Sequence, residues 1–438
     1  MNMLRAEFDR LMVRTESQRC WIWARSADII YSGFFILLAY MTTKSIWSII
    51  MRTHSYMTTD WGISYAGGFV RRGLIGDVIL HLSRASGLSF AEVTAVIAVV
   101  ANLLFVLGAA LLFARLRHNH WAWLLIYTPA GLAFGATNPG ILGHKDVLLL
   151  ALGAMLFSGA TLLPEGWKRT TWVLCGLALT IPLVLSHEGL VIFVPILFIA
   201  LSALRLTPPV IGVTALIVLG LGAAVLASVM HSGTIAQRDA MIEAFYAALP
   251  PQWSLDSLDE YVAFWFVGQS VTDTFAFVAT RNYIALWELP FAVALAFGPI
   301  AVAACGLHIS RAFSDPKGRI SAHLIVLSYV SLIALMPLVI DWMRFFIVLG
   351  ILTAMAMAMR LRLSCGDRVE TLPGAVATPE NAAFRYMLGW VLLAALFVLT
   401  PGKVSPWLVH FGWNDILTVV LVGIASGCWP VLARKRRQ

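Results

Sequence analysis

The sequence predicts an all-α integral membrane protein with about twelve transmembrane helices. Of its 438 residues, 60% are apolar and only 12% are charged, whereas about a quarter of the residues in a soluble domain are charged. Long apolar runs also recur along the chain from residue 29 to residue 431, which is far more than a single membrane anchor requires. These observations exclude an ordinary soluble globular protein.

Each predicted span is a run of about 15 to 23 mostly apolar residues, a length that crosses the hydrocarbon core of a bilayer as a helix. A helix also satisfies its own backbone hydrogen bonds, which lipid cannot do. The twelve predicted spans cover residues 28–50, 91–114, 121–137, 147–163, 170–186, 189–204, 209–230, 284–306, 320–340, 345–359, 386–400 and 415–433.

The distribution of charge indicates how the chain is oriented. With these spans, 21 of the 31 Lys and Arg residues but only 9 of the 23 acidic residues lie on the same side as the N-terminus. That side carries a net charge of +12 and the other side −4, which together give the formal net charge of +8. Because Lys and Arg accumulate on the cytoplasmic side, we predict a multi-pass protein of the cytoplasmic (inner) membrane with both termini inside the cell.

The lengths of the connections divide the chain into five parts. A cytoplasmic segment, residues 1–27, precedes a first transmembrane module, residues 28–230, which includes a long outer loop at 51–90. A second long outer (periplasmic) loop, 231–283, mixes aromatic and acidic residues, as is typical of helices that lie at the membrane interface. A second transmembrane module, 284–433, and a basic cytoplasmic tail, 434–438, follow.

Several kinds of chemistry have no support in the sequence. It contains no Cys and His spacing typical of zinc, no P-loop and no dinucleotide-binding glycine pattern. The basic tail is better explained as a determinant of orientation and a contact for lipid headgroups than as a nucleic-acid patch. We therefore expect no nucleic-acid partner and no soluble nucleotide site.

Four groups of charged residues are candidate functional residues, because charges near the bilayer are costly unless they pair or face water. Each group lies in a connection between spans on the predicted outer side. The groups are Asp60 with Arg71 and Arg72, His144 with Lys145 and Asp146, His187 with Glu188, and Asp341 with Arg344. Groups that are distant in sequence therefore meet at one membrane face, as expected of an active site at the outer leaflet.

The first group has a structural and a functional interpretation. Asp60 can simply cap a helix, or it can take a proton from an acceptor hydroxyl if the neighbouring Gly-rich turn leaves it exposed. Arg71 and Arg72 can reach lipid headgroups, or their guanidinium groups can hold phosphate oxygens where flanking glycines let the backbone approach.

The other groups have similar alternatives. Asp146 and Glu188 suit the first turn of a helix, where the helix dipole favours acids. Because neighbouring residues of a helix point about 100° apart, His187 and Glu188 need not face the same site. Asp341 and Arg344 are three residues apart, which suits an ion pair within one helix.

An acidic residue in the first outer loop, Asp60, is followed by Lys145 and Asp146 in the second outer connection. This pattern resembles the GT-C superfamily of membrane glycosyltransferases, and the resemblance covers the first six or seven predicted spans best. Members of that superfamily use a polyprenyl-linked sugar donor at the outer leaflet. The resemblance therefore implies a GT-C-like fold and an active site that faces the periplasm or exterior.

The resemblance also implies an activity and residue roles. The enzyme would transfer a sugar from a polyprenyl (undecaprenyl) phosphate donor in the lipid bilayer to an envelope glycan, lipid or protein, with Asp60 as general base. Four cations would bind the donor phosphate: Arg71, Arg72, Lys145 and Arg344. Five residues would orient these cations or bind sugar hydroxyls: His144, Asp146, His187, Glu188 and Asp341. Some members use a divalent metal, but the sequence shows no tight group of oxygen ligands, and we predict no obligatory metal or cofactor.

Two other functions use the same observations. A Wzy-like polysaccharide polymerase or ligase would join undecaprenyl diphosphate-linked oligosaccharides, with similar electrostatic requirements at the outer face. A transporter or flippase is the third interpretation, although the sequence shows no internal repeat, which many secondary transporters have.

Overall fold

The computed structural model describes residues 28–29, 31–51, 56–117, 119–127, 132, 143–250, 262–269, 272–274, 276, 300–301, 303–305, 307, 309–335 and 342–365. These residues form helices and connecting loops, and no β-strand occurs among them. The first long helix covers Tyr31–Met51. It is followed by α2 (Tyr56–Gly62), α3 (Leu74–Ser86), α4 (Phe90–Phe113), η1 (Ala114–Leu116), α5 (His120–Tyr127), α8 (Asp146–Leu162), α9 (Trp167–Ala178), α10 (Thr180–Ser186), η2 (Glu188–Phe193), α11 (Val194–Leu197), η3 (Phe198–Ala203), α12 (Pro208–Met230), α13 (Ile235–Ala247), α14 (Val262–Trp265), α17 (Ile309–Ala312), α18 (Pro316–Leu335) and α19 (Trp342–Cys365).

Six of the described helices are long and apolar enough to cross a membrane, as expected of a membrane-embedded helical protein. They are Tyr31–Met51, Phe90–Leu116, Trp167–Ser186, Pro208–Met230, Pro316–Leu335 and Arg344–Ser364. Two shorter apolar helices, Asp146–Leu162 and Glu188–Ala203, coincide with two more predicted spans. The predicted spans 386–400 and 415–433 lie outside the described residues, and 121–137 and 284–306 are described only in part.

Two of the predicted spans are not continuous α-helices. Pro182 has no backbone N–H to donate within the helix, and the chain is divided at Leu179 into α9 and α10. The segment Glu188–Ala203 alternates between 3₁₀ and α geometry around Pro195. The break between α10 and η2 places His187 in an extended conformation at an end of two helices.

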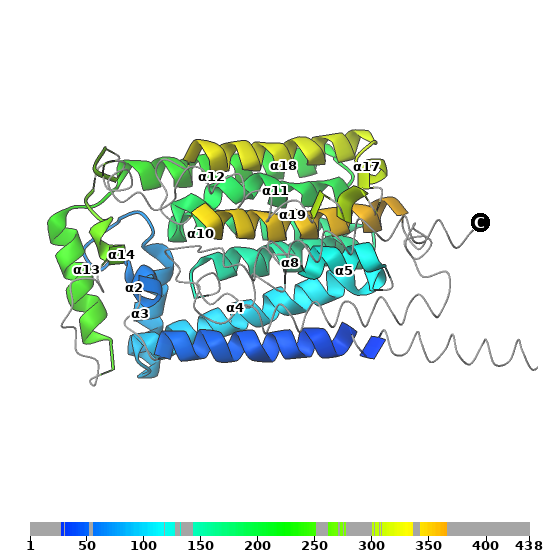
Figure 1. Cartoon of the computed structure of the whole chain (residues 1–438). Helices are drawn as coiled ribbons and strands as arrows, with labels where there is room; N and C mark the ends of the chain where they lie inside the picture. The colour runs from blue at the N-terminus through cyan, green and yellow to red at the C-terminus, as the bar shows by residue number, and fades with distance from the viewer. Residues whose placement is uncertain are drawn as a thin grey trace, which may run out of the picture.

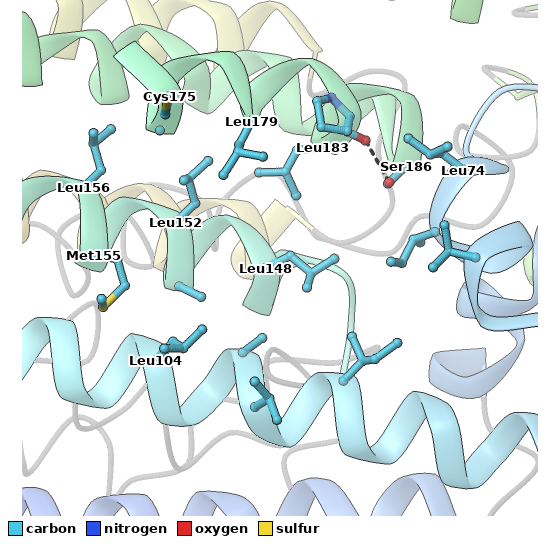
Figure 2. A pocket seen from close by; sticks show the side chains of 18 of the residues that line it. Leu74, Leu104, Leu148, Leu152, Met155, Leu156, Cys175, Leu179, Leu183 and Ser186 are labelled. Carbon is cyan, nitrogen blue, oxygen red and sulfur yellow. Dashed lines mark hydrogen bonds between the residues drawn. The ribbon is translucent and has the colours of Figure 1, made fainter. Parts of the chain in front are cut away.

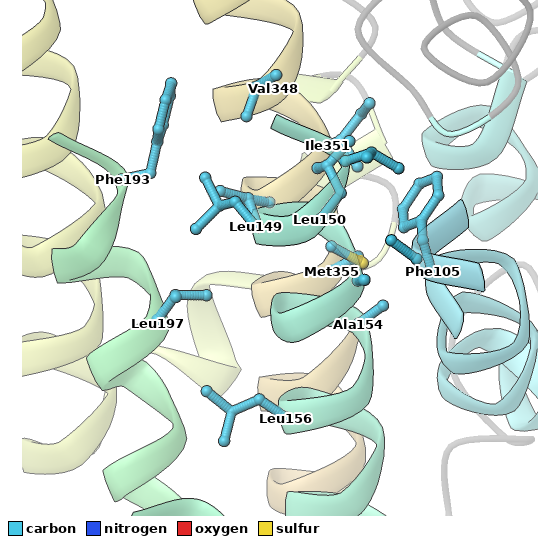
Figure 3. Close-up of a cluster of buried hydrophobic side chains, with 14 of the residues drawn as sticks. Phe105, Leu149, Leu150, Ala154, Leu156, Phe193, Leu197, Val348, Ile351 and Met355 are labelled. Atoms are coloured by element: carbon cyan, nitrogen blue, oxygen red, sulfur yellow. The ribbon is translucent and has the colours of Figure 1, made fainter. Parts of the chain in front are cut away.

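The core of the bundle surrounds α8, which packs against α4 and α19. Figure 3 shows Leu150 of α8 next to Ile351 of α19, with Phe105 of α4 on the same side, whereas Phe193 and Leu197 lie on the opposite side. The apolar stretch of α19 is 89% buried, whereas those of α12 and α18 are each 22% buried. α12 and α18 therefore present apolar side chains outward, where lipid can cover them.

Four short helices lie at one end of the bundle, where α8 begins (Figure 1). α3 is amphipathic, since it buries residues at helical spacing: Gly76, Ile79, Leu80 and Ser83. α13 begins with a capping box formed by Thr234 and Gln237. α2 contacts α3, α13 and α14, so the two long outer loops predicted from the sequence meet in one structured cap.

Gly76 sets how closely α3 approaches α2. A Cβ atom added at Gly76 would lie 2.0 Å from the carbonyl oxygen of Ile63 and 2.5 Å from that of Trp61. We expect Gly76→Ala to lower the free energy of unfolding by about 1–3 kcal/mol, because backbone atoms must move to admit the methyl group. Gly222→Ala is the matched control, since nothing lies within 4 Å of a Cβ atom there. Thermal unfolding of the purified protein in detergent measures both; equal melting temperatures would contradict the tight contact.

Candidate active site

Asp60 lies in α2 and is held inside the cap. The indole nitrogen of the adjacent Trp61 donates a hydrogen bond to the carbonyl of Gly143 at 2.8 Å, which ties α2 to the segment that precedes α8. Asp60 is only 2% exposed, and its Oδ2 lies 3.8 Å from Nδ1 of His144. The neighbouring Gly-rich turn therefore does not leave Asp60 exposed, because α3, α13 and α14 contact α2.

Lys145 is the most deeply buried charge of the group. It is fully buried and donates hydrogen bonds to the carbonyls of Arg72 at 3.0 Å and Ser186 at 3.1 Å. Arg72 has a φ of 67°, a left-handed conformation that is uncommon for residues other than glycine. The Lys145 ammonium thus holds a strained turn of the first outer loop against the end of α10.

Arg72 and Glu188 form a forked ion pair. Nε of Arg72 lies 2.8 Å and 2.9 Å from the two carboxylate oxygens of Glu188, and its Nη2 lies 2.8 Å from Oε1. Both side chains keep about a fifth of their surface exposed, 18% and 20%. Glu188 follows His187, which is buried and accepts a hydrogen bond from the amide of Gly189. Glu188 and His187 therefore both lie near Arg72, although neighbouring residues of a helix need not face the same site.

Arg344 begins α19 on the opposite side of α8. Its Nε lies 3.2 Å from Oδ2 of Asp146, so Asp146 pairs across two helices in addition to being a first-turn acid of α8. Asp341, the partner expected from sequence spacing, lies outside the described residues. The pair with Asp146 fixes the starts of α8 and α19 next to each other.

The second outer loop supplies a contact that sequence reasoning missed. Nη2 of Arg71 donates to the carbonyl of Phe266 at 2.8 Å, and the guanidinium of Arg72 lies 5.8 Å from the centre of the Phe266 ring. The backbone amide of Arg71 also donates to the carbonyl of His231. The sequence feature that pointed to this part of the chain was the cluster of aromatic residues in the 231–283 loop, and it did not indicate a contact with Arg71 or Arg72.

Together these residues form a buried charged cluster with an excess of positive charge. Among the described residues it contains four cations, Arg71, Arg72, Lys145 and Arg344, and three carboxylates, those of Asp60, Asp146 and Glu188. With the histidines counted as neutral, these described residues carry a net charge of +1.

Burial alone would raise the pKa of Asp60, but the positive charge of Lys145, with His144 and His187, outweighs burial and holds that pKa well below 3.8. Burial, aided by the charge of Arg72, lowers the pKa of His187 to about 3. At neutral pH Asp60 is therefore ionised and His187 is neutral.

An apolar cavity of about 780 Å³ opens beside the cluster. It extends between α3, α4, α8, α9 and α10, and Figure 2 shows its wall from Leu74 and Ser186 at one end to Cys175 and Leu156 at the other. Leu74 lies two residues after Arg72, and the carbonyl of Ser186 accepts the hydrogen bond from Lys145. The cavity therefore runs from the charged cluster along apolar side chains of α4, α8, α9 and α10, several of which, such as Val100 and Leu179, are exposed on the outside of the bundle.

No family model, curated protein or solved structure matches the chain. The residues of the cluster and of the cavity are therefore the basis for a functional proposal. Among the described residues, no three His, Cys, Asp or Glu side chains are grouped as a metal site requires.

Proposed function

We propose that the protein is a GT-C-type membrane glycosyltransferase that transfers a sugar from a polyprenyl phosphate donor to an envelope glycan, lipid or protein. The observation that carries the proposal is the cation-rich cluster next to one end of an apolar cavity, where Ser186 lines the cavity and accepts a hydrogen bond from Lys145. A phosphate linked to a long hydrocarbon chain needs both features next to each other, because its headgroup is anionic and its tail is insoluble in water.

The charge of the cluster fits a sugar joined to the lipid by a single phosphate. Such a phosphodiester carries one negative charge, which would balance the net charge of +1. Arg71 and Arg72 are only partly buried and are the cations placed to contact the phosphate directly. Lys145 is fully buried, and it would act by positioning the turn at Arg72 and through its charge. Arg344 would add to that charge from the start of α19.

In the proposed reaction, the acceptor hydroxyl gives its proton to Asp60 and its oxygen bonds to the anomeric carbon of the donor. The bond between that carbon and the phosphate oxygen breaks, and the leaving phosphate takes the electron pair. The transition state at the sugar is oxocarbenium-like. The cations stabilise the charge that develops on the phosphate. His144, Asp146, His187 and Glu188 would orient these groups or bind sugar hydroxyls.

A polymerase or ligase that uses diphosphate-linked oligosaccharides remains the alternative for the same site. A diphosphate donor carries more negative charge than the cluster has in excess, and this favours the monophosphate donor. The two activities differ in product, since a polymerase releases polyprenyl diphosphate and a transferase releases polyprenyl phosphate.

The proposal is tested with the purified full chain in lipid nanodiscs, supplied with synthetic polyprenyl phosphate and polyprenyl diphosphate sugars. We expect release of polyprenyl phosphate, which mass spectrometry detects. We also expect KM to be lower for long-chain donors than for short-chain donors. Leu152→Trp narrows the cavity and should raise KM for the long-chain donor alone. Leu107→Trp, on the exposed face of α4, is the control. No released lipid with any donor and a crude envelope acceptor would contradict the proposal.

The pKa of Lys145 predicts how the reaction depends on pH. Burial, opposed by Asp60 and aided by Arg72, lowers the pKa of its ammonium from 10.5 to about 8. The charge is present below that pH and is lost above it, so donor binding should weaken up to about tenfold for each pH unit above 8. Donor titrations from pH 6 to 10 measure this effect, and constant affinity across that range would contradict it.

The loss of donor binding should not come from unfolding. Between about pH 8 and pH 10.5 the unfolded chain still binds the proton of Lys145 and the folded chain has released it. This group alone therefore makes the folded state more stable, relative to the unfolded state, as the pH rises through that window. A melting temperature measured at each pH separates the two effects.

A further inference from the structure

A second cavity, of about 960 Å³, lies among different residues from the charged cluster. Residues of four segments line it: the connection between α8 and α9, the connection between η3 and α12, the start of α18 and the last turns of α19. α8 starts at the cluster and ends at Leu162, and its 17 residues span about 25 Å. The cavity and the cluster are therefore at opposite ends of the bundle, about one hydrocarbon thickness apart.

The second cavity has an excess of positive charge. Four cations line it, and so do two carboxylates, which leaves a net charge of +2. The lining charges are Arg169, Arg205, Lys317, Arg360, Glu165 and Asp315. Basic side chains at the ends of helices commonly bind the last backbone carbonyls of the helix. The contacts of each cation therefore decide whether the cavity can also bind a ligand.

Three of the cations are anchored to backbone carbonyls. Nζ of Lys317 donates to the carbonyls of Ser202 at 3.2 Å and Leu204 at 2.7 Å. Arg169 donates to the carbonyl of Leu163, and Arg360 donates to the carbonyl of Ala312. These bonds cap helix ends and hold the cations in place. Arg360 is also paired with Asp315 at 2.6 Å and Arg169 with Glu165 at 3.8 Å, so the net charge of +2 comes from Arg205 and Lys317.

Two features are not explained by capping. The side chain of Arg205 is 90% exposed, and its nearest carboxylate, that of Glu165, is 3.7 Å away. Oγ of Ser202, which lines the cavity, is buried and hydrogen-bonds to none of the described residues. A buried hydroxyl without a partner and a net charge of +2 are what an anionic ligand with several acceptor oxygens would satisfy.

We propose that this cavity binds the headgroup of an anionic phospholipid from the membrane leaflet at that end of the bundle. Trp167 at its rim is 74% exposed, as is typical of Trp at the membrane–water interface. The apolar face of α12, with Ile211 and Val213 exposed, continues from the cavity and offers a surface for acyl chains. A phospholipid with two phosphates, such as cardiolipin, matches the charge of +2 carried by the described lining residues.

Native mass spectrometry of the full chain, titrated with cardiolipin, phosphatidylglycerol or phosphatidylcholine, tests the proposal. We expect cardiolipin to bind at least tenfold more tightly than phosphatidylcholine. Arg205→Gln and Lys317→Gln together should remove most of that difference. Lys168→Gln, a cation next to the cavity whose ammonium lies over the Trp167 ring instead, is the matched control and should keep it.

Several outcomes would overturn the proposal. One is equal binding of cardiolipin by the wild type and the double variant, and another is an equal loss in Lys168→Gln, which would indicate attraction to the whole basic end. Saturation by inorganic pyrophosphate with no lipid bound would assign the site to a soluble phosphate. If the double variant does not fold, Arg205→Gln alone, whose side chain is exposed, provides the comparison.

Discussion

Asp60→Asn is expected to abolish sugar transfer, with a loss of about 10²- to 10⁴-fold in kcat, while the protein still folds and enters the membrane. The amide has nearly the shape of the carboxylate but cannot accept the proton of the acceptor hydroxyl. Within the described residues no arginine is paired with Asp60, and its Oδ2 lies 3.8 Å from Nδ1 of His144. Asp146 and Glu188 are each paired with an arginine, and we therefore assign the role of base to Asp60.

Transfer is measured as release of polyprenyl phosphate by the purified variant in nanodiscs, and folding as its melting temperature and elution volume. Asp77→Asn is the matched control, since Asp77 lies on α3 in the same cap but pairs with His81. The variant also separates two roles of Asp60. If Asp60 serves only to neutralise Lys145, Asp60→Asn should lower stability and leave kcat nearly unchanged, and that result would contradict the catalytic role.

Arg72→Gly is expected to raise KM for the donor by about 10- to 100-fold while KM for the acceptor changes little. The loss would be that of a charge-assisted contact between the guanidinium and the donor phosphate, about 1.5–3 kcal/mol. Glycine is chosen because Arg72 has a φ of 67°, which glycine adopts without cost. The carbonyl that accepts the hydrogen bond from Lys145 then stays in place.

Two further variants at this position control the result. Arg72→Ala removes the same side chain but adds backbone strain, so it should be less stable than Arg72→Gly by about 1 kcal/mol. Arg72→Lys keeps the charge and loses the fork, and its donor KM should lie between those of the wild type and Arg72→Gly. Donor titrations of all three variants decide the question. Equal changes in donor and acceptor KM would show that Arg72 supports the cap rather than the phosphate.

Apolar run length predicted the helical membrane architecture well for the part of the chain that the structure describes. Eight predicted spans coincide with the described long or shorter apolar helices, because the requirement that backbone groups be satisfied within the helix leaves few alternatives. The breaks inside them were harder to predict. Proline marked the division near Pro182, but the 3₁₀ geometry between Glu188 and Ala203 depends on packing against other helices.

The positions of the charged groups were predicted better than their partners. The four groups were expected at one membrane face, and their described members lie together at one end of the bundle. Sequence spacing also favoured a pair of Asp341 with Arg344; Asp341 lies outside the described residues, and the contact of Arg344 with Asp146 is one that spacing did not predict. Spacing reports neighbours along one helix, and this pair forms between α8 and α19, which only the tertiary fold brings together. Burial of Asp60 was missed for the same reason, since α13 and α14 are far from it in sequence.

The pair between Asp146 and Arg344 has a consequence for biosynthesis. Asp146 leaves the ribosome long before Arg344, so the nascent chain inserts α8 when the guanidinium that balances its first residue does not yet exist. Breaking a buried ion pair by removing one partner is strongly unfavourable, and the start of α8 gains this contact only when α19 has arrived. Closure of this end of the bundle is thus coupled to insertion of α19, whose first turn carries Arg344.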